Sequence, residues 1–138
     1  MTRAVRHIAG LAALFLCGSV AAAQSLPPLK ENPRVRGEFL SAAIGDEIRN
    51  QCPSISARDG RVAARTLELA NYALGLGYSW SDINAMRSDP VAKAELVALR
   101  DAYLRQNGAR PGDPESYCRL GRAEIAKNSL TGWLLREN

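Results

Sequence analysis

The sequence predicts an all-α protein, a compact bundle of about five helices closed by one disulfide bond between Cys52 and Cys118. Five stretches begin at a residue that commonly caps a helix and continue with apolar side chains three or four positions apart. No stretch alternates apolar and polar residues between hairpin turns, as a half-buried strand would. Two cysteines remain once the predicted signal peptide is removed, and an even number of cysteines in an exported protein is typical of disulfides.

The first 23 residues are predicted to be a secretory signal peptide. Arg3 and Arg6 provide a basic start, Ile8–Val20 is an apolar run of 13 residues, and three consecutive alanines end at Ala23. Small residues after such a run mark a cleavage site, so we expect cleavage after Ala23 and a periplasmic or secreted protein.

Two alternatives to cleavage remain open at this stage, a lipidated Cys17 and a signal that is retained as an anchor. A lipoprotein signal has a small residue directly before its cysteine, whereas Leu16 stands there. The apolar run is also shorter than the roughly 20 residues that a membrane-spanning helix needs. We therefore expect export, with no stable membrane span after cleavage.

Cleavage would leave 115 of the 138 residues, with 16 basic and 14 acidic side chains and a net charge of +2. That length suits one domain, which we expect to span residues 33–138. A small net charge spread over helices of mixed sign provides no basic footprint for nucleic acid, so no nucleic-acid partner is expected.

The chain has one histidine, His7, which would leave with the signal peptide. Without it, the exported protein lacks the imidazole of a Ser-His or Cys-His pair and of a histidine metal site. If Cys52 and Cys118 form a disulfide, no thiolate remains either; the alternative is two buried free thiols. We therefore expect a protein that is not an enzyme and binds no metal or cofactor.

Residues 24–32 are expected to form an extended lead-in, because they contain two consecutive prolines and no apolar period. Asn32 and Pro33 then match the cap and the first position of a helix that should continue to about Gln51. In this helix Ile44, Ile48 and Cys52 are spaced four residues apart and so share its inner face, with Leu40 one turn before them. Its glycines, Gly37 and Gly45, either admit a closely packed neighbour or are weak points on an exposed face.

The second helix is predicted to begin at an S-x-x-D capping pattern formed by Ser56 and Asp59, and to end at Gly75 and Gly77. Its apolar stripe consists of Val62, Thr66, Leu69, Ala73 and Leu76.

The same reasoning places three more helices. Ser79 and Asp82 repeat the capping pattern for a short helix that ends near Arg87, and Asp89 caps a fourth that ends at Gly108. A fifth should start at Asp113–Pro114 and carry Cys118 inward. The last apolar residues, Leu130, Trp133 and Leu134, either extend the fifth helix or fold back from it.

Arg58, Arg61 and Arg65 lie three and four positions apart and form a basic stripe that could contact an acidic partner, a phosphate or anionic lipid headgroups. The alternative is the solvated side of an amphipathic helix, with Asp59 interleaved. Trp80, at the first position of its helix, is a second candidate contact residue because large aromatic side chains often anchor interfaces. The alternative for Trp80 is a purely structural role.

Glu38, Asp46 and Glu47 form the densest acidic cluster and suggest, as a minor alternative, a hydrolase that uses carboxylates alone. Asp46 and Glu47 point about 100° apart on one helix, however, so a solvated helix face explains them better. Glu47 is expected to pair with an arginine instead.

Two segments, Ile44–Arg58 and Pro111–Ile125, each contain one of the two cysteines. With them the chain resembles domain of unknown function 5333, a group of short exported proteins from the alpha class of proteobacteria. The resemblance covers essentially the whole exported chain and implies export and two cysteines, but no activity. Genes of this group often lie near those of the respiratory NADH dehydrogenase, which implies an accessory role beside a membrane complex.

Together these expectations describe an exported, non-enzymatic helical protein that binds or supports an envelope or respiratory-membrane protein. Its size, helices and single disulfide are also similar to those of small periplasmic acid-stress chaperones, although no motif is shared beyond two cysteines. A small stress chaperone is therefore an alternative function, at the level of fold analogy only. The oligomeric state stays open.

Overall fold

The computed structural model describes residues 25–138, so the predictions for the signal peptide, Cys17 and His7 lie outside the described residues. The fold is all-α apart from one pair of short strands, which confirms the predicted class. In chain order the elements are η1 (Leu29–Glu31), α1 (Pro33–Gln51), β1 (Ile55–Ala57), α2 (Asp59–Gly75), α3 (Trp80–Ser88), α4 (Pro90–Gln106), α5 (Pro114–Ala126), α6 (Leu130–Trp133) and β2 (Leu135–Glu137).

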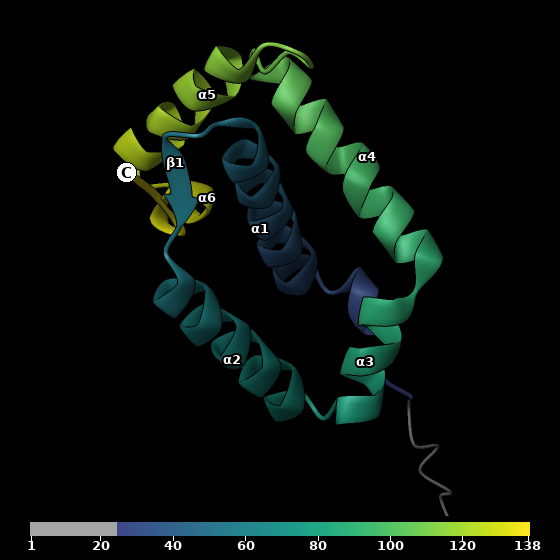
Figure 1. Ribbon diagram of the computed structural model, residues 1–138. Coiled ribbons are helices and arrows are strands. Elements are labelled where there is room, and N and C mark those ends of the chain that lie inside the picture. The colour runs from purple at the N-terminus through teal and green to yellow at the C-terminus, as the bar shows by residue number, and fades with distance from the viewer. Residues whose placement is uncertain (1–24) are drawn as a thin grey trace, which may run out of the picture.

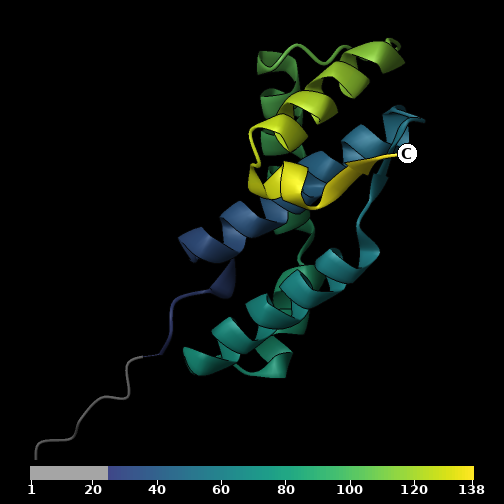
Figure 2. The ribbon, with the colours of Figure 1, turned by 90° about the vertical axis from the view of Figure 1, so that its left-hand side faces the viewer.

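Helix α1 lies at the centre of the molecule. In Figure 1 the helices α2, α3, α4 and α5 follow one another around it, and α1 packs against α4, α5 and α6. Figure 2 shows α2 and α3 together at one end, and α5 and α6 together at the other. Helix α2 follows β1 in the chain, contacts α3 at its other end, and joins the smaller core cluster through its second half.

The disulfide Cys52–Cys118 joins the end of α1 to α5, with 5.1 Å between the two Cα atoms. Both cysteines are buried in the larger core cluster with Ile44, Ile48 and Leu135, as the apolar stripe of the first helix predicted. A ring of 66 residues is worth about 4 kcal/mol in the chain-entropy account of disulfides, which is model-dependent.

A smaller core cluster lies at the other end of α1. Leu29 and Val35 meet Ala73, Tyr78 and Ile83 there. The burial of Leu29 explains why Leu29–Glu31 forms a 3₁₀ turn inside the segment that was expected to be extended. The Tyr78 hydroxyl donates to the carbonyl of Pro27 at 2.8 Å and so fastens the lead-in to this cluster.

The helix caps at Asn32, Ser79, Asp89 and Asp113 are formed as predicted, each side chain accepting from backbone N–H groups of the next turn. Ser79 and Asp82 make the full capping box. The predicted cap at Ser56 is wrong. Ser56 lies in β1, opposite Arg136 of β2, and α2 begins three residues later without a side-chain cap.

The antiparallel pair of β1 and β2 was not predicted, because each strand has only three residues and they are about 80 positions apart. The last apolar residues fold back, as one of the two alternatives proposed: α6 turns away from α5 after Asn128, whose φ is +50°. Gly132 permits this turn, since a Cβ there would collide with the Glu124 carbonyl. Gly45 lies buried beneath Thr131, whereas Gly37 is exposed with nothing nearby.

Candidate functional site

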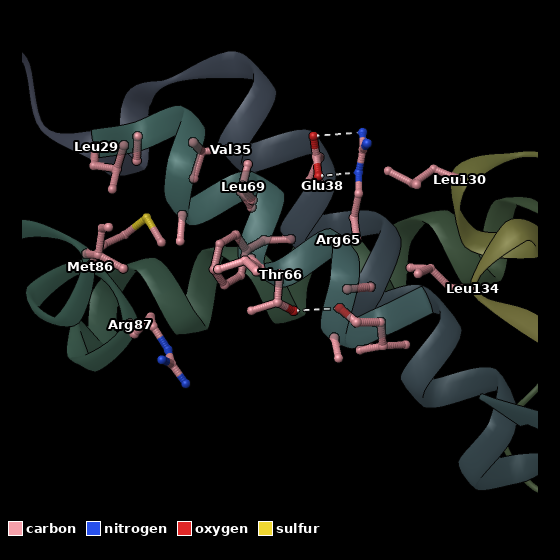
Figure 3. Close-up of a pocket in the computed structure, with 18 of the residues that line it drawn as sticks. Leu29, Val35, Glu38, Arg65, Thr66, Leu69, Met86, Arg87, Leu130 and Leu134 are labelled. Carbon is pink, nitrogen blue, oxygen red and sulfur yellow. Dashed lines mark hydrogen bonds and ion pairs between the residues drawn. The ribbon is translucent and has the colours of Figure 1, made fainter. Parts of the chain in front are cut away.

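An apolar groove of about 580 Å³ lies between α1, α2 and α3 and ends at α6. Its floor is formed by residues of the smaller core cluster, and Figure 3 shows Leu29, Val35 and Leu69 at one end with Leu130 and Leu134 at the other. Val35, Ala73 and Ile83 in this floor are 2%, 2% and 8% exposed. The groove is therefore a recess above a formed core.

The walls of the groove expose large apolar side chains. Leu67 of α2 is 59% exposed and Trp80 of α3 is 56% exposed. Burying such a side chain completely is worth roughly 1.5–3 kcal/mol or more, so both leave apolar surface without a partner. Single exposed apolar residues are ordinary, but here they border one continuous apolar recess.

A second groove of about 230 Å³ lies between α1, α3 and α4. It shares Val35, Phe39, Met86 and Arg87 with the first groove, so the two adjoin along α3. Leu99 of α4, 43% exposed, lines its far side. The two grooves together provide an apolar surface that extends from α6 to α4.

Polar contacts beside the groove fasten the first half of α2 to α1 and α6. Arg65 makes two hydrogen bonds to Glu38 of α1, from Nε at 2.9 Å and from the terminal nitrogen at 3.0 Å, as Figure 3 shows. Arg61 donates to the carbonyl of Trp133 at 3.0 Å and lies over its ring. The planar guanidinium suits both kinds of contact, and it bridges gaps that apolar side chains of α2 do not fill.

The predicted basic stripe thus binds within the protein. Arg58 donates to the carbonyl of Leu135 at 2.8 Å, and Arg61 and Arg65 bind α6 and α1 as described. Trp80 is the one predicted contact residue whose side chain lies mostly in solvent. The groove was not predicted. Its signal in the sequence is the apolar stripe of the second helix, which shows an apolar face without showing whether anything covers it.

The acidic residues on α1 are distributed among different arginines. Glu38 is 8% exposed and also accepts from Arg34 at 3.0 Å, while Asp46 pairs with Arg49 on the surface. Glu47 pairs with Arg100 of α4 at 3.4 Å, which agrees with the expectation that it binds an arginine. Their arrangement is that of ion pairs between and along helices.

Residues 27–136 match the sequences of a family of unknown function (DUF5333). The chain belongs to this family. The matched range contains the helices of the described residues, Cys52 and Cys118, and both grooves, and it confirms the resemblance to this family. No curated protein matches the chain, and no solved structure does.

Besides that of Glu38, this member of the DUF5333 family contains a second buried carboxylate, which no pattern in the sequence indicates. Glu124 of α5 is 1% exposed, and it accepts hydrogen bonds from Tyr103 at 2.6 Å and from Ser129, and pairs with Lys127 at 2.6 Å. Burial opposes its ionisation, but the hydrogen bonds from Lys127, Ser129 and Tyr103 outweigh burial and lower the pKa of Glu124. Burial, with the bond to Glu124, raises the pKa of Tyr103.

The Glu124 cluster is satisfied from within the protein, because each polar atom has a partner and the carboxylate is closed off from solvent. It fastens the end of α5 to α4 and to the start of α6. Within residues 25–138, no group of three histidine, cysteine, aspartate or glutamate side chains is arranged to hold a metal ion. No helix in that part of the chain is both long and apolar enough to cross a membrane.

Proposed function

We propose that this DUF5333 protein is an exported, non-enzymatic binding protein that holds a segment of an envelope or respiratory-membrane protein in the groove between α1, α2 and α3. The observation that carries the proposal is the exposure of Leu67 and Trp80 beside an apolar recess with a buried floor. Leu67 and Trp80 are two of seven large apolar side chains exposed among residues 25–138, but both border the same recess, and contiguous apolar surface of this kind marks a site of interaction.

The open walls favour a protein segment over a small molecule as the occupant. Pockets for small ligands usually cover 70–90% or more of the ligand surface, in about 300–1,000 Å³. The groove has a volume in that range, but Leu67, Trp80 and Leu99 each leave more than two-fifths of their surface in solvent. A chain segment laid along the groove would cover these walls itself, in the way that helices fill hydrophobic grooves.

The attachment of α2 also suits a binding role. The helix is joined to α1 by the Arg65–Glu38 pair and to α6 by Arg61, while its central apolar residues face the groove. The first half of α2 is the part that can shift against an occupant, since the contacts of this helix with the smaller core cluster are all made from Leu69 onward. This is the behaviour expected of the less strongly packed parts of a protein.

The test is site-specific photo-cross-linking in the native cell envelope. A benzoylphenylalanine at position 67 should cross-link to one defined protein, which mass spectrometry identifies. The same group at Arg119, an exposed residue of α5 away from the groove, should not give that product. Equal products from both positions, or none from position 67, would overturn the proposal.

A small periplasmic stress chaperone is the second candidate, because the same exposed Leu67 and Trp80 could hold apolar segments of unfolded clients. This function predicts that the protein suppresses aggregation of a model client at neutral or acidic pH. A Leu67→Ser variant should then lose that protection. If wild-type protein protects at neither pH, the chaperone function is excluded.

A further inference from the structure

We infer that the occupant of the two adjoining grooves is an acidic amphipathic helix, whose apolar face covers the recess and whose carboxylates meet Arg36, Arg87 and Lys93. The inference deepens the proposed function and rests on it, since it names the chemistry of the partner segment. Two observations support the inference: the positive charges on the border of the second groove, and the shape of the recess.

The border of the second groove is strongly basic. Lys30, Arg36, Arg87 and Lys93 line it, against one acidic residue, Glu95. Only Lys30 is satisfied internally, by an ion pair to Asp89 at 2.8 Å. Among residues 25–138, no ion pair is formed by Arg36, Arg87 or Lys93, so the border of this groove has an excess of positive charge, with Glu95 as its one acidic side chain.

Arg87 occupies the key position because it borders both grooves. In Figure 3 its side chain extends from α3 into open space, away from Met86 and the other apolar residues. Eight of the 13 arginines in residues 25–138 bind a carboxylate or a carbonyl within the protein, as Arg58, Arg61 and Arg65 do. A guanidinium that is free beside an apolar recess is well placed to receive a carboxylate from a bound segment.

A helix fits this surface better than an extended strand. The grooves are lined by side chains of helices, whose backbone groups are already bonded within those helices. An added strand needs a free sheet edge, and the one sheet, formed by β1 and β2, contributes no residue to either groove. An amphipathic helix needs only apolar pockets for side chains three and four positions apart.

The recess also argues against other anionic occupants. A bilayer surface is flat and would reach Leu67 and Trp80 but not the buried floor at Val35 and Ile83. The basic start of the chain, with Arg3 and Arg6, has the same charge sign as the border and does not complement it. An acidic amphipathic helix would cover the recess with its apolar face and place carboxylates beside the unpaired cations.

Two fluorescent peptides of about 18 residues, five turns of helix, provide the test. They share one leucine and alanine face and differ only in glutamate or lysine on the polar face. Anisotropy titrations with the purified exported protein should show the glutamate peptide binding about tenfold or more tightly than the lysine peptide, a difference that shrinks from low to high salt. The double variant Arg87→Glu, Lys93→Glu should reverse the preference.

Arg105→Glu is the matched control, since Arg105 is an exposed arginine at the end of α4 outside both grooves. It should leave the preference for the glutamate peptide unchanged. Equal affinity for both peptides, or a loss at Arg105 as large as at Arg87 and Lys93, overturns the inference. So does preferential binding to vesicles of anionic lipid or to a fatty acid.

The outcome for the peptides is separable from that of the proposed function. If neither peptide binds but position 67 still cross-links to a defined protein, the acidic helix is wrong and the groove remains a docking site. If the peptides do not bind and position 67 gives no product, both statements fall.

Discussion

Arg65 of α2 and Glu38 of α1 are joined by two hydrogen bonds, at 2.9 and 3.0 Å, and the carboxylate is 8% exposed. Hydrogen bonds to a charged group contribute about 1.5–3 kcal/mol when they are sheltered from water. The pair forms one wall of the groove, so it couples the position of α2 to the shape of the candidate site.

Replacing Arg65 by methionine should therefore lower the free energy of unfolding by about 1–3 kcal/mol, because Glu38 stays buried and keeps only its bond to Arg34. Urea titration followed by circular dichroism measures the change. The control is Arg49→Met, which breaks the exposed pair with Asp46 and should cost less than about 1 kcal/mol. If the two variants lose equal amounts of unfolding free energy, the buried pair stabilises the protein no more than the exposed pair does.

The disulfide leads to a chemical prediction. A thiol assay on the unreduced exported protein should find no free thiol even after denaturation, because Cys52 and Cys118 are bonded. Changing both to alanine should reduce the free energy of unfolding by about 2–5 kcal/mol. Two titratable thiols in the denatured protein would contradict the bond and would revive the possibility of thiol chemistry.

Local signals in the sequence predicted the helices well. A cap such as Asn32, or the pair Ser79 and Asp82, depends only on residues within one turn, so its signature is complete in the sequence. The stripe of Ile44, Ile48 and Cys52 succeeded for the same reason, since helical spacing alone sets which residues share a face.

Contacts between distant residues were not predictable in this way. Ser56 has the chemistry of a cap, but it pairs with Arg136, 80 positions away, and tertiary pairing outweighs the local preference. Arg58 and Arg61 bind carbonyls of the C-terminal segment that no spacing rule identifies. The groove was missed because an apolar stripe shows which side of a helix avoids water, and does not show whether anything covers it.

Gly132 is tightly packed and Gly37 has open space around it, so the two glycines together test the packing of the helices. Gly132→Ala should destabilise the protein by about 1–3 kcal/mol, because the new Cβ would collide with the Glu124 carbonyl and push α6 away from α5. Gly37→Ala should instead stabilise it by about 0.5–1 kcal/mol, since the residue is exposed within α1 with free space around it. Thermal melts of both variants and of wild type measure these changes in stability. A neutral Gly132→Ala would mean that α5 and α6 are not closely packed.

The buried Glu124 predicts a component of stability that depends on pH. Its pKa is lowered in the folded protein, so its contribution is present above the unfolded pKa of about 4.3 and is lost as the pH falls through the folded value. Lys127 has a raised pKa, so its share persists through neutral pH and is lost only in strongly basic solution.

The measurement is the free energy of unfolding from pH 7 to pH 3 for wild type and for Glu124→Gln. The variant should be less stable at neutral pH and should lose less stability on acidification than wild type does. The control is Glu115→Gln, which removes a carboxylate paired with Arg122 on the surface of α5. Parallel pH profiles for wild type and Glu124→Gln would contradict the assigned role of the carboxylate.

A substitution in the exposed wall of the groove should weaken binding of the occupant while leaving the free energy of unfolding almost unchanged. Leu67 is 59% exposed, so Leu67→Ser should change the free energy of unfolding by no more than about 0.5–1 kcal/mol, mostly through helix propensity. Binding should fall sharply, because the side chain would be buried only when the groove is occupied.

Leu104→Ala is the converse control: Leu104 is 4% exposed in the core, and its loss should cost about 2–5 kcal/mol. Urea titrations measure stability, and cross-linking from position 80 measures occupancy. A Leu67→Ser protein that is as destabilised as Leu104→Ala would show that Leu67 belongs to the core, whereas a stable variant with undiminished cross-linking would show that the occupant lies elsewhere.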